Sequence, residues 1–470
     1  MGSGPNGLAA AIHLARNDFD VQVRECAPEP GGGARSAQIT LPGFVHDLGS
    51  AVHPMAVCSP FFRSLPLRQH GLQWIFSPAP LAHPLDDSTA VMLEKDLSTT
   101  AKQLGPDAAA YRKLFGPLVE HWQELMAEVL RPLPSFPRHP LLLGSFGMRA
   151  VQPATVLART LFEGERARAL FGGLAAHSIL KLEMLLSSAF GMILGGSGHA
   201  VGWPVPQGGS QSITNALAGV LHSFGGRILT NSPVTSLDGL GNPDLVLFDV
   251  TPRQFLALAE NRLPRSFRQS LRRYRYGPGI FKVDYALREP IPWRAKECLR
   301  AGTVHLGGTL PEIAASERAA WGPKPADKPF LLLAQQSLFD PSRAPVGQHT
   351  AWVYSHVPNG WRGSVLPELE AQIERFAPGF KECVLARAVH TPADLQQFNP
   401  NLIGGDINGG AADVAQFVLR PTWRRYATPL KGVFLCSSST PPGGGVHGMC
   451  GYHAARWALS WFRSRVRISS

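Results

Sequence analysis

The sequence has no C-x-x-C pair among its six cysteines, so neither a dithiol redox centre nor a zinc knuckle is expected, and we predict no metal site. Charged residues make up only 17%, which argues against extensive disorder. No apolar run reaches the roughly 18 residues of a membrane-spanning helix, and no secretory signal opens the chain. We therefore expect a protein that is neither secreted nor transmembrane, in the cytoplasm or, in a eukaryote, an organelle matrix.

Acidic residues are also under-represented, since 45 Lys and Arg face 34 Asp and Glu for a net charge of +11. The densest basic stretch, residues 262–275, has its arginines at helical spacing beside leucines, which is typical of a solvated helix face. No zinc-finger, helix-turn-helix or RNA-binding motif accompanies it, so no nucleic-acid partner is expected. Peripheral contact with an anionic membrane is a second use for such a surface. The oligomeric state stays open.

The chain has 470 residues, which is enough for two or three domains. Hydrophobic periodicity predicts α/β material at both ends and mixed α+β material between them. We expect helices at 8–16, 108–130, 153–190, 211–224 and 448–464, and strands at 21–25, 227–230, 244–250, 279–287, 329–338, 350–357 and 433–435. The predicted fold is a discontinuous Rossmann-like FAD/NAD(P)-binding domain (1–60, 200–255 and 396–470). A mixed-sheet and helical substrate domain (61–199 and 256–395) is inserted into it.

The first motif is GSGPNG at residues 2–7, a G-x-G-x-x-G followed by a helix. Gly2 permits a tight turn, Gly4 lets the backbone approach a pyrophosphate, and Gly7 allows close packing of the helix. Glu25 ends the next strand, where a partner for a ribose hydroxyl belongs, and a Glu there disfavours a 2′-phosphate. The alternative is a chance glycine-rich turn. The strand expected before Gly2 is absent, so either the true start lies upstream or the polypeptide is a truncated version.

Two further glycine-rich segments point to a dinucleotide. EPGGGARS, residues 29–36, offers a second close approach with Arg35 supplying charge, although a plain surface turn fits too. STPPGGGVHGMCGYHAARWAL, residues 439–459, places a loop without side chains before a second helix N-terminus. Such a site suits the electron-rich edge of a reduced isoalloxazine ring. A flavoprotein needs it, whereas a nicotinamide-only dehydrogenase does not.

Several segments resemble the phytoene-desaturase-like branch of the flavin amine oxidase superfamily, over nearly the whole chain. They are TLPGFVHDLGSAVHP (40–54), RYGPGIFKVDYAL (275–287), IPW (291–293), LLAQQSLFDP (332–341), NPNLIGGDINGG (399–410) and CSSSTPPGGGVHGMCGYHAA (436–455). The resemblance implies FAD as cofactor. It implies that the ADP half is held by Gly2, Gly4, Gly7, Glu25 and Arg35, with the backbone at Val234 meeting the adenine. It also implies that the flavin ring is lined by Gly444, Gly445, Val446 and Gly448.

The residues that face the substrate are less sharply defined. The resemblance implies an enzyme without an obligatory catalytic dyad, in which the flavin N5 accepts the hydride. The catalytic candidates are His447, Lys282 and Asp47. Lys282 and Asp284 share one face of a predicted strand, as a structural ion pair or as a lysine near the flavin. Asp47 alternatively bonds its own turn. Other candidates are His46, His53, Asp406 and Asn408, and Cys450 is expected to be a buried free thiol.

The sequence therefore predicts an FAD-dependent oxidoreductase, a dehydrogenase, desaturase or isomerase that takes hydride from a hydrophobic small-molecule substrate. The apolar helical block at 108–190 motivates the apolar substrate. The alternative is a non-catalytic or weakly catalytic flavoprotein that acts as a regulatory scaffold. An enzyme has its flavin reduced by a substrate or by reduced nicotinamide, whereas a scaffold does not.

Overall fold

Segments from both ends of the chain form the predicted nucleotide-binding region in a computed structural model that describes residues 1–132 and 135–469. Two parallel strand pairs lie at its centre, β1 (Gln22–Arg24) with β8 (Arg227–Leu229) and β9 (Val246–Phe248) with β15 (Val433–Leu435). Met1 and Gly2 bridge them. The Met1 carbonyl accepts from the Asp249 amide at 2.8 Å, and the Gly2 amide donates to the Arg24 carbonyl at 2.9 Å. The backbone of residues 1–2 therefore joins β1 to β9.

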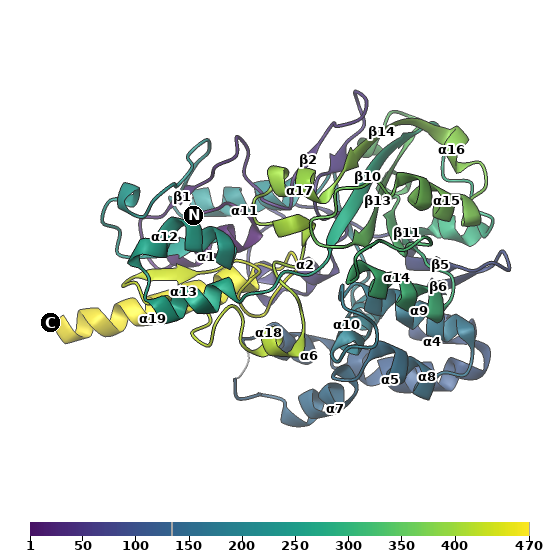
Figure 1. Ribbon diagram of the computed structural model, residues 1–470, viewed down its shortest axis with the longest axis horizontal. Coiled ribbons are helices and arrows are strands. Elements are labelled where there is room, and N and C mark those ends of the chain that lie inside the picture. The colour runs from purple at the N-terminus through teal and green to yellow at the C-terminus, as the bar shows by residue number, and fades with distance from the viewer. Residues whose placement is uncertain (133–134, 470) are drawn as a thin grey trace.

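Three helices surround these strands: α1 (Pro5–Ala15), α11 (Gln211–Ser223) and α19 (Met449–Ser469). The first and the last of them cross at very short range. A side chain on Gly451 would overlap the Asn6 carbonyl, and one on Gly448 would press against Ala9 and Phe62. These glycines let the backbones of α1 and α19 touch, which brings helices from the two ends of the chain together at the left of the molecule (Figure 1).

A seven-stranded sheet forms the second part of the molecule, in the order β14-β10-β13-β12-β11-β5-β6. Its strands are β5 (Ala79–Pro84), β6 (Ala90–Leu93), β10 (Gly279–Leu287), β11 (Ala301–Leu306), β12 (Leu331–Ala334), β13 (His349–Val357) and β14 (Val384–His390). All neighbours are antiparallel except β5 and β11, which are parallel. The strand predicted at 279–287 coincides with β10. The prediction of a strand at 329–338 is wrong beyond Ala334, because Gln336–Leu338 form a 3₁₀ turn.

The two faces of this sheet differ in chemistry because side chains alternate along each strand. Phe281, Val283 and Tyr285 of β10 belong to an apolar core with Ile373 and Phe380. The latter two lie on α15 (Leu366–Phe376) and α16 (Phe380–Cys383). The even-numbered residues of β10 point to the opposite face. That face therefore carries the buried charges Lys282 and Asp284.

Helices cover the lower part of the molecule in Figure 1. They are α4 (Leu97–Lys102), α5 (Ala108–Glu120), α6 (Trp122–Val129), α7 (Pro140–Ala150), α8 (Ala154–Leu161), α9 (Glu165–Ala176), α10 (Ser187–Ala200) and α14 (Leu310–Ala320). Pro140 is the first residue of α7. A proline fits there because the first helical residue has no intrahelical amide bond to lose. Within the described residues no single helix has the length and apolarity to cross a bilayer. Helices α7 and α8 have that length and apolarity only when they are taken as a pair, and the pair is bent by 97°.

Shorter elements complete the chain: β2 (Ser36–Ala37), β3 (His46–Asp47), α2 (Pro54–Cys58), α3 (Pro60–Arg63), β4 (Trp74–Ile75), β7 (Val205–Pro206), α12 (Pro252–Ala259), α13 (Arg265–Arg272), α17 (Pro392–Phe398) and α18 (Val414–Val418). Helix α13 forms the central part of the densest basic stretch. Its Phe267 and Leu271 are buried, whereas Arg265 and Arg272 are exposed. The interpretation of this stretch as a solvated helix face is confirmed.

Candidate functional site

The phosphate-loop motif folds as a tight turn into the start of α1. Gly2 has φ +90°, a left-handed conformation that glycine adopts without strain. A side chain on Gly7 would overlap the Gly2 carbonyl, so this glycine allows the helix to pack on the loop. Gly4 precedes Pro5 at the helix start, and a side chain there would meet the Asp249 carboxylate at 3.0 Å. The conformation of Gly2 and the packing at Gly7 match their predicted roles, and the approach of a pyrophosphate to Gly4 stays a prediction.

Glu25 lies directly beside this loop, at the carboxyl end of β1. Its carboxylate accepts hydrogen bonds from the Ser3 amide at 2.8 Å and from the Ser3 hydroxyl at 2.6 Å. Burial acts to raise the pKa of Glu25, but the hydrogen bonds from Ser3 and Ala27 outweigh it and lower that pKa. The carboxylate is thus ionised and fixed next to the phosphate loop. The backbone carbonyl of Glu25 accepts from the Ser232 amide at 2.8 Å. The buried Val234 lies two residues after Ser232 in the chain.

Asp249, which the sequence analysis missed, points its carboxylate at the same helix start. Its Oδ2 accepts from the Gly7 amide at 2.9 Å and lies 3.0 Å from the position of a Cβ on Gly4. The Asp249 side chain thereby satisfies one of the free amides of the first turn of α1. Burial raises the pKa of Asp249 from 3.8 to about 6, against the opposing hydrogen bond from Gly7. No sequence signal marks this residue, because 242 positions separate it from Gly7.

We predict that Asp249→Asn stabilises the protein above pH 6 by about 1–3 kcal/mol, since each pKa unit is worth about 1.4 kcal/mol. The folded pKa of about 6 lies above the unfolded value of 3.8, so the folded state binds the proton more tightly. Stability therefore falls as the pH rises from about 4 to about 6, and the loss is complete above that range. Asparagine keeps an acceptor for Gly7 without the cost of ionisation.

Urea unfolding at pH 5 and pH 8 measures this difference in stability between Asp249→Asn and the wild type. The exposed Asp327→Asn is the control, and an Asp249→Asn variant that loses stability at pH 8 would contradict the prediction.

The glycine run after β1 sits between the phosphate loop and the sheet. A side chain on Gly32 would meet the Gly4 Cα at 3.0 Å, and one on Gly49 would overlap the Gly33 carbonyl. Arg35 is not a plain solvated side chain. Its guanidinium donates to the Phe398 carbonyl at 3.0 Å and lies 4.1 Å from the centre of the Phe398 ring. Arg35 therefore ties this loop to α17, and a contact with phosphate stays a prediction.

The C-terminal glycine loop lies against a second glycine-rich loop, residues 404–410. A side chain on Gly444 would meet the Asn408 carbonyl at 3.1 Å. Buried Arg420 donates to the carbonyls of Asn408 at 3.1 Å and Gly410 at 3.0 Å. Asp406, also buried, accepts from the Gly277 amide at 2.8 Å. Asp406 and Asn408 therefore belong to an ordered loop beside the predicted ring site, and Asp406 is not in a surface turn.

His447 and its neighbours form the start of α19. The His447 Nδ1 accepts from the Met449 amide at 3.0 Å, and burial lowers its pKa to about 4, so the ring is neutral. His447 thus caps the helix, and a catalytic role stays a prediction. Gly445 has φ +122°, which L-residues rarely adopt, and Val446 is half-buried. Cys450 is buried, and its thiol contacts the Gly443 carbonyl at 3.2 Å, in line with the free thiol expected there.

Lys282 and Asp284 form a buried ion pair on the face of the sheet that looks toward the nucleotide-binding region. The ammonium lies 5.9 Å from the centre of the Trp352 ring, and the Trp352 indole donates to the Gly49 carbonyl at 3.1 Å. Because Gly49 packs on Gly33, this chain of contacts connects Lys282 to the glycine run after β1. Burial acts to raise the pKa of Asp284, but Lys282 and nearby histidines lower it overall. His46 lies 3.8 Å from Asp284.

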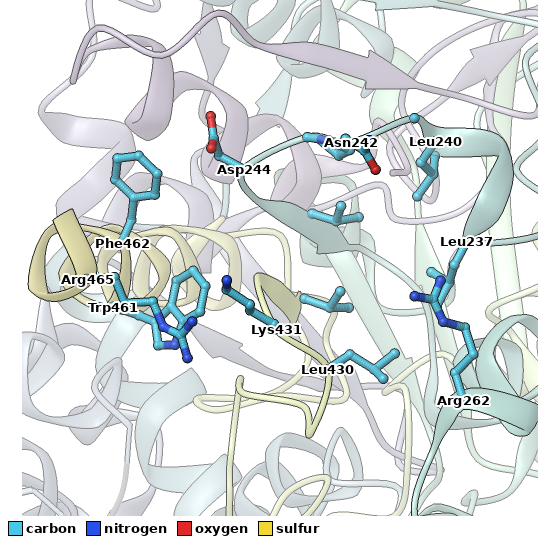
Figure 2. A pocket seen from close by; sticks show the side chains of 14 residues that line it. Leu237, Leu240, Asn242, Asp244, Arg262, Leu430, Lys431, Trp461, Phe462 and Arg465 are labelled. Atoms are coloured by element: carbon cyan, nitrogen blue, oxygen red, sulfur yellow. The ribbon is translucent and has the colours of Figure 1, made fainter. Parts of the chain in front are cut away.

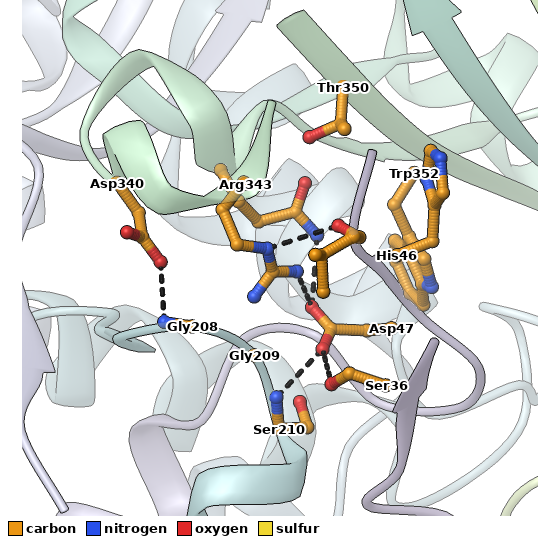
Figure 3. Close-up of polar contacts among 12 residues, drawn as sticks. Ser36, His46, Asp47, Gly208, Gly209, Ser210, Asp340, Arg343, Thr350 and Trp352 are labelled. Carbon is orange, nitrogen blue, oxygen red and sulfur yellow. Dashed lines mark hydrogen bonds and ion pairs between the residues drawn. The ribbon is translucent and has the colours of Figure 1, made fainter. Parts of the chain in front are cut away.

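Asp47 is the centre of a buried network that joins three distant segments (Figure 3). One carboxylate oxygen accepts from the Ser36 hydroxyl at 2.7 Å and the Ser210 amide at 2.8 Å. The other pairs with Arg343, and both side chains are fully buried. His53 bonds the Ser210 hydroxyl at 2.8 Å. Because both Asp47 oxygens are engaged, this geometry favours a positioning role over the predicted catalytic one, and Arg343 is a residue that sequence reasoning missed.

A hollow of about 710 Å³ lies elsewhere, at the opposite ends of β9 and β15 (Figure 2). Val246 and Val433, the first residues of these strands, line it together with Trp461 and Arg465 of α19. Ligands of open parallel sheets bind at the carboxyl ends of the strands. The phosphate loop lies at those carboxyl ends, next to Asp249. The hollow in Figure 2 is therefore separate from the predicted dinucleotide site.

The fold is that of the FAD/NAD(P)-binding oxidoreductases, which confirms the predicted fold class. Residues 1–63 match the family model of an NAD(P)-binding Rossmann-like domain. The chain is 26% identical to mouse (Mus musculus) pyridine nucleotide-disulfide oxidoreductase domain-containing protein 2, with 97% of this chain and 92% of that protein covered.

Two solved structures share the fold. An oxidoreductase from Methanosarcina mazei superposes with a TM-score of 0.63 at 16% identity, covering 98% of each chain. Putrescine oxidase with bound putrescine superposes with a TM-score of 0.61 at 16% identity, covering 98% of this chain and 97% of that one. The predicted resemblance is thus confirmed at the level of the fold. The phytoene-desaturase-like type is not specifically supported, because putrescine oxidase is an amine oxidase.

Proposed function

We propose that this protein is an FAD-dependent oxidoreductase that takes hydride from a hydrophobic organic substrate. The observation that carries the proposal is the crossing of α1 and α19, whose backbones touch at Asn6 and Gly451. Two helix N-termini, each preceded by a glycine loop, are thereby held side by side. A helix N-terminus favours negative charge. One of them suits a pyrophosphate, and the other suits the electron-rich edge of a flavin ring.

The residues present fit FAD. Glu25 would bind the adenosine ribose, the backbone of Gly4 would approach the pyrophosphate, and Val234 would meet the adenine. Gly444, Gly445 and Val446 would line the isoalloxazine ring, which supplies hydride acceptance when bound. The ordered 404–410 loop and Arg420 hold the C-terminal glycine loop in place from behind.

The substrate would approach the sheet face that carries Lys282 and Asp284. Trp352 and Met55 are half-buried hydrophobic residues that pack against the main apolar core. His177 is also partly accessible, and its Nε2 bonds the His305 Nε2 at 2.9 Å. Burial lowers the pKa of His177 to about 3, so the imidazole is neutral. A neutral imidazole here would accept a hydrogen bond from a substrate N–H or O–H.

The first experiment is an absorption spectrum of the purified protein, followed by identification of the flavin released on heating. The proposal requires FAD at about one per chain and its bleaching by a substrate or by reduced nicotinamide. Amines and apolar alcohols are the first substrates to screen. A protein with FAD that no reductant bleaches would favour the alternative, a flavoprotein that serves as a regulatory scaffold. A colourless protein that takes up no added FAD would remove the proposal altogether.

Flavin reduction distinguishes a Lys282 that acts on the reaction from a Lys282 that only forms a structural ion pair. We predict that the double variant Lys282→Met/Asp284→Asn retains FAD but reduces it about 10²–10³-fold more slowly, the usual cost of losing a charge placed at the reacting atoms. Changing both partners avoids leaving an unpaired buried charge. If the pair is only structural, the double variant reduces its flavin at the wild-type rate. Asp86→Asn, at an exposed ion pair with Arg375, is the matched control.

A further inference from the structure

Helix α7 presents an apolar stripe to solvent. Leu141 is 89% exposed and Met148 71% exposed, while the preceding Phe136 is 92% exposed. Leu141, Gly144, Ser145 and Met148 follow each other at three- and four-residue intervals, which places them on one side of the helix. Phe146 and Ala150 lie on the other side and are buried. Large apolar side chains exposed together in this way mark an interaction surface.

The stripe belongs to a fixed part of the fold. The Glu128 carboxylate at the end of α6 accepts from the Arg138 amide at 2.7 Å and from the His139 amide at 3.1 Å. The same carboxylate pairs with Arg131 at 3.0 Å. These bonds attach the start of α7 to α6, and the buried Phe146 attaches its middle. The helix is therefore held with Leu141 and Met148 outward.

The exposed charges in the segment that carries the stripe all have one sign. Residues 129–162 contain no aspartate or glutamate, and their four arginines are Arg131, Arg138, Arg149 and Arg159. Arg138 and Arg159 are exposed, and Arg149 is half-exposed next to Met148. An apolar stripe edged by arginines without carboxylates is complementary to anionic headgroups over hydrocarbon. A protein surface that docked here would have to supply the carboxylates itself.

We infer that α7 docks the protein on the surface of an anionic phospholipid bilayer, with Phe136, Leu141 and Met148 inserted at the boundary between headgroups and acyl chains. The helix has 11 residues and is followed by α8 at a bend of 97°, so α7 fits in the plane of the interface. The inference does not depend on the proposed flavin chemistry. It would give an oxidoreductase for apolar substrates access to molecules dissolved in the bilayer.

The test is co-sedimentation of the full chain with vesicles of phosphatidylcholine alone and of phosphatidylcholine mixed with phosphatidylglycerol. We expect binding to the mixed vesicles that weakens with added salt. The variant Leu141→Gln/Met148→Gln should bind at least about tenfold more weakly, given the usual value of a buried apolar side chain. Arg138→Gln should cost about fivefold, the contribution of one basic residue near an anionic surface.

Val346→Gln is the matched control, because Val346 is fully exposed in the loop before β13, far from α7 in the sequence. It should bind vesicles like the wild type, and all these variants should keep the wild-type flavin content and melting temperature. Absence of binding to the mixed vesicles overturns the inference, as does unchanged binding by the Leu141→Gln/Met148→Gln variant. So does a wild-type dimer in light scattering that this variant converts to a monomer without any vesicle binding, which would make the stripe a self-association surface.

Discussion

Replacing Gly4 with valine is expected to yield a folded protein that no longer retains FAD, with affinity lowered at least about a hundredfold. A Cβ at this position would lie 3.0 Å from the Asp249 carboxylate and 3.9 Å from the Gly32 Cα, so the free protein accommodates it with a small shift. The branched side chain then occupies the space in front of α1 where a pyrophosphate would lie. Flavin released per chain and the melting temperature measure the two effects separately.

Gly116→Val is the control for this variant. Gly116 lies inside α5, and a Cβ there would come no closer than 4.0 Å to Leu97. It should keep full flavin content. A yellow Gly4→Val protein with FAD at about one per chain would show that the phosphate loop has been placed wrongly. Gly7→Ala does not serve the same purpose, because its Cβ would overlap the Gly2 carbonyl and disturb the fold itself.

The second large effect is expected at the buried pair of Asp47 and Arg343. Arg343→Met should lower the free energy of unfolding by about 3–5 kcal/mol, because it leaves the Asp47 carboxylate buried without its cation. Burial acts to raise the pKa of Asp47, but Arg343 and the Ser210 amide lower it, so this carboxylate is ionised in the fold. Urea unfolding measures the loss.

The double variant Asp47→Leu/Arg343→Met should lose less stability than Arg343→Met, since apolar side chains of similar size replace a buried ion pair at little cost. Flavin reduction then separates positioning from catalysis. If Asp47 only positions the loop that carries Gly49, the double variant keeps a measurable rate with FAD bound. If the double variant is as unstable as the single one, the pair does not contribute through its charges.

Local patterns account for the elements that the sequence predicted well. The glycine spacing at 2–7 and the periodicity after it predict α1, and alternation or continuous apolar runs predict β10 and β15. Four strands of the sheet, β5, β6, β11 and β14, were not predicted. Strand β5 ends in a proline, and β14 is a half-exposed edge strand. Their conformation depends on neighbours in the sheet, because β-propensity reflects packing more than backbone preference.

The sequence alone predicts most of the candidate cofactor site, since each glycine loop and Glu25 carries its signal within about 25 residues of chain. It did not locate Asp249, Arg343 or Arg420. These residues act through contacts that span 242 positions to Gly7, 296 to Asp47 and 12 to Asn408, the last within an irregular loop. Only folding brings a carboxylate to a helix start or a guanidinium to a buried aspartate. Local backbone requirements can thus be predicted from the order of residues in the sequence. The partners of buried charges, and their protonation, depend on the packing of distant segments.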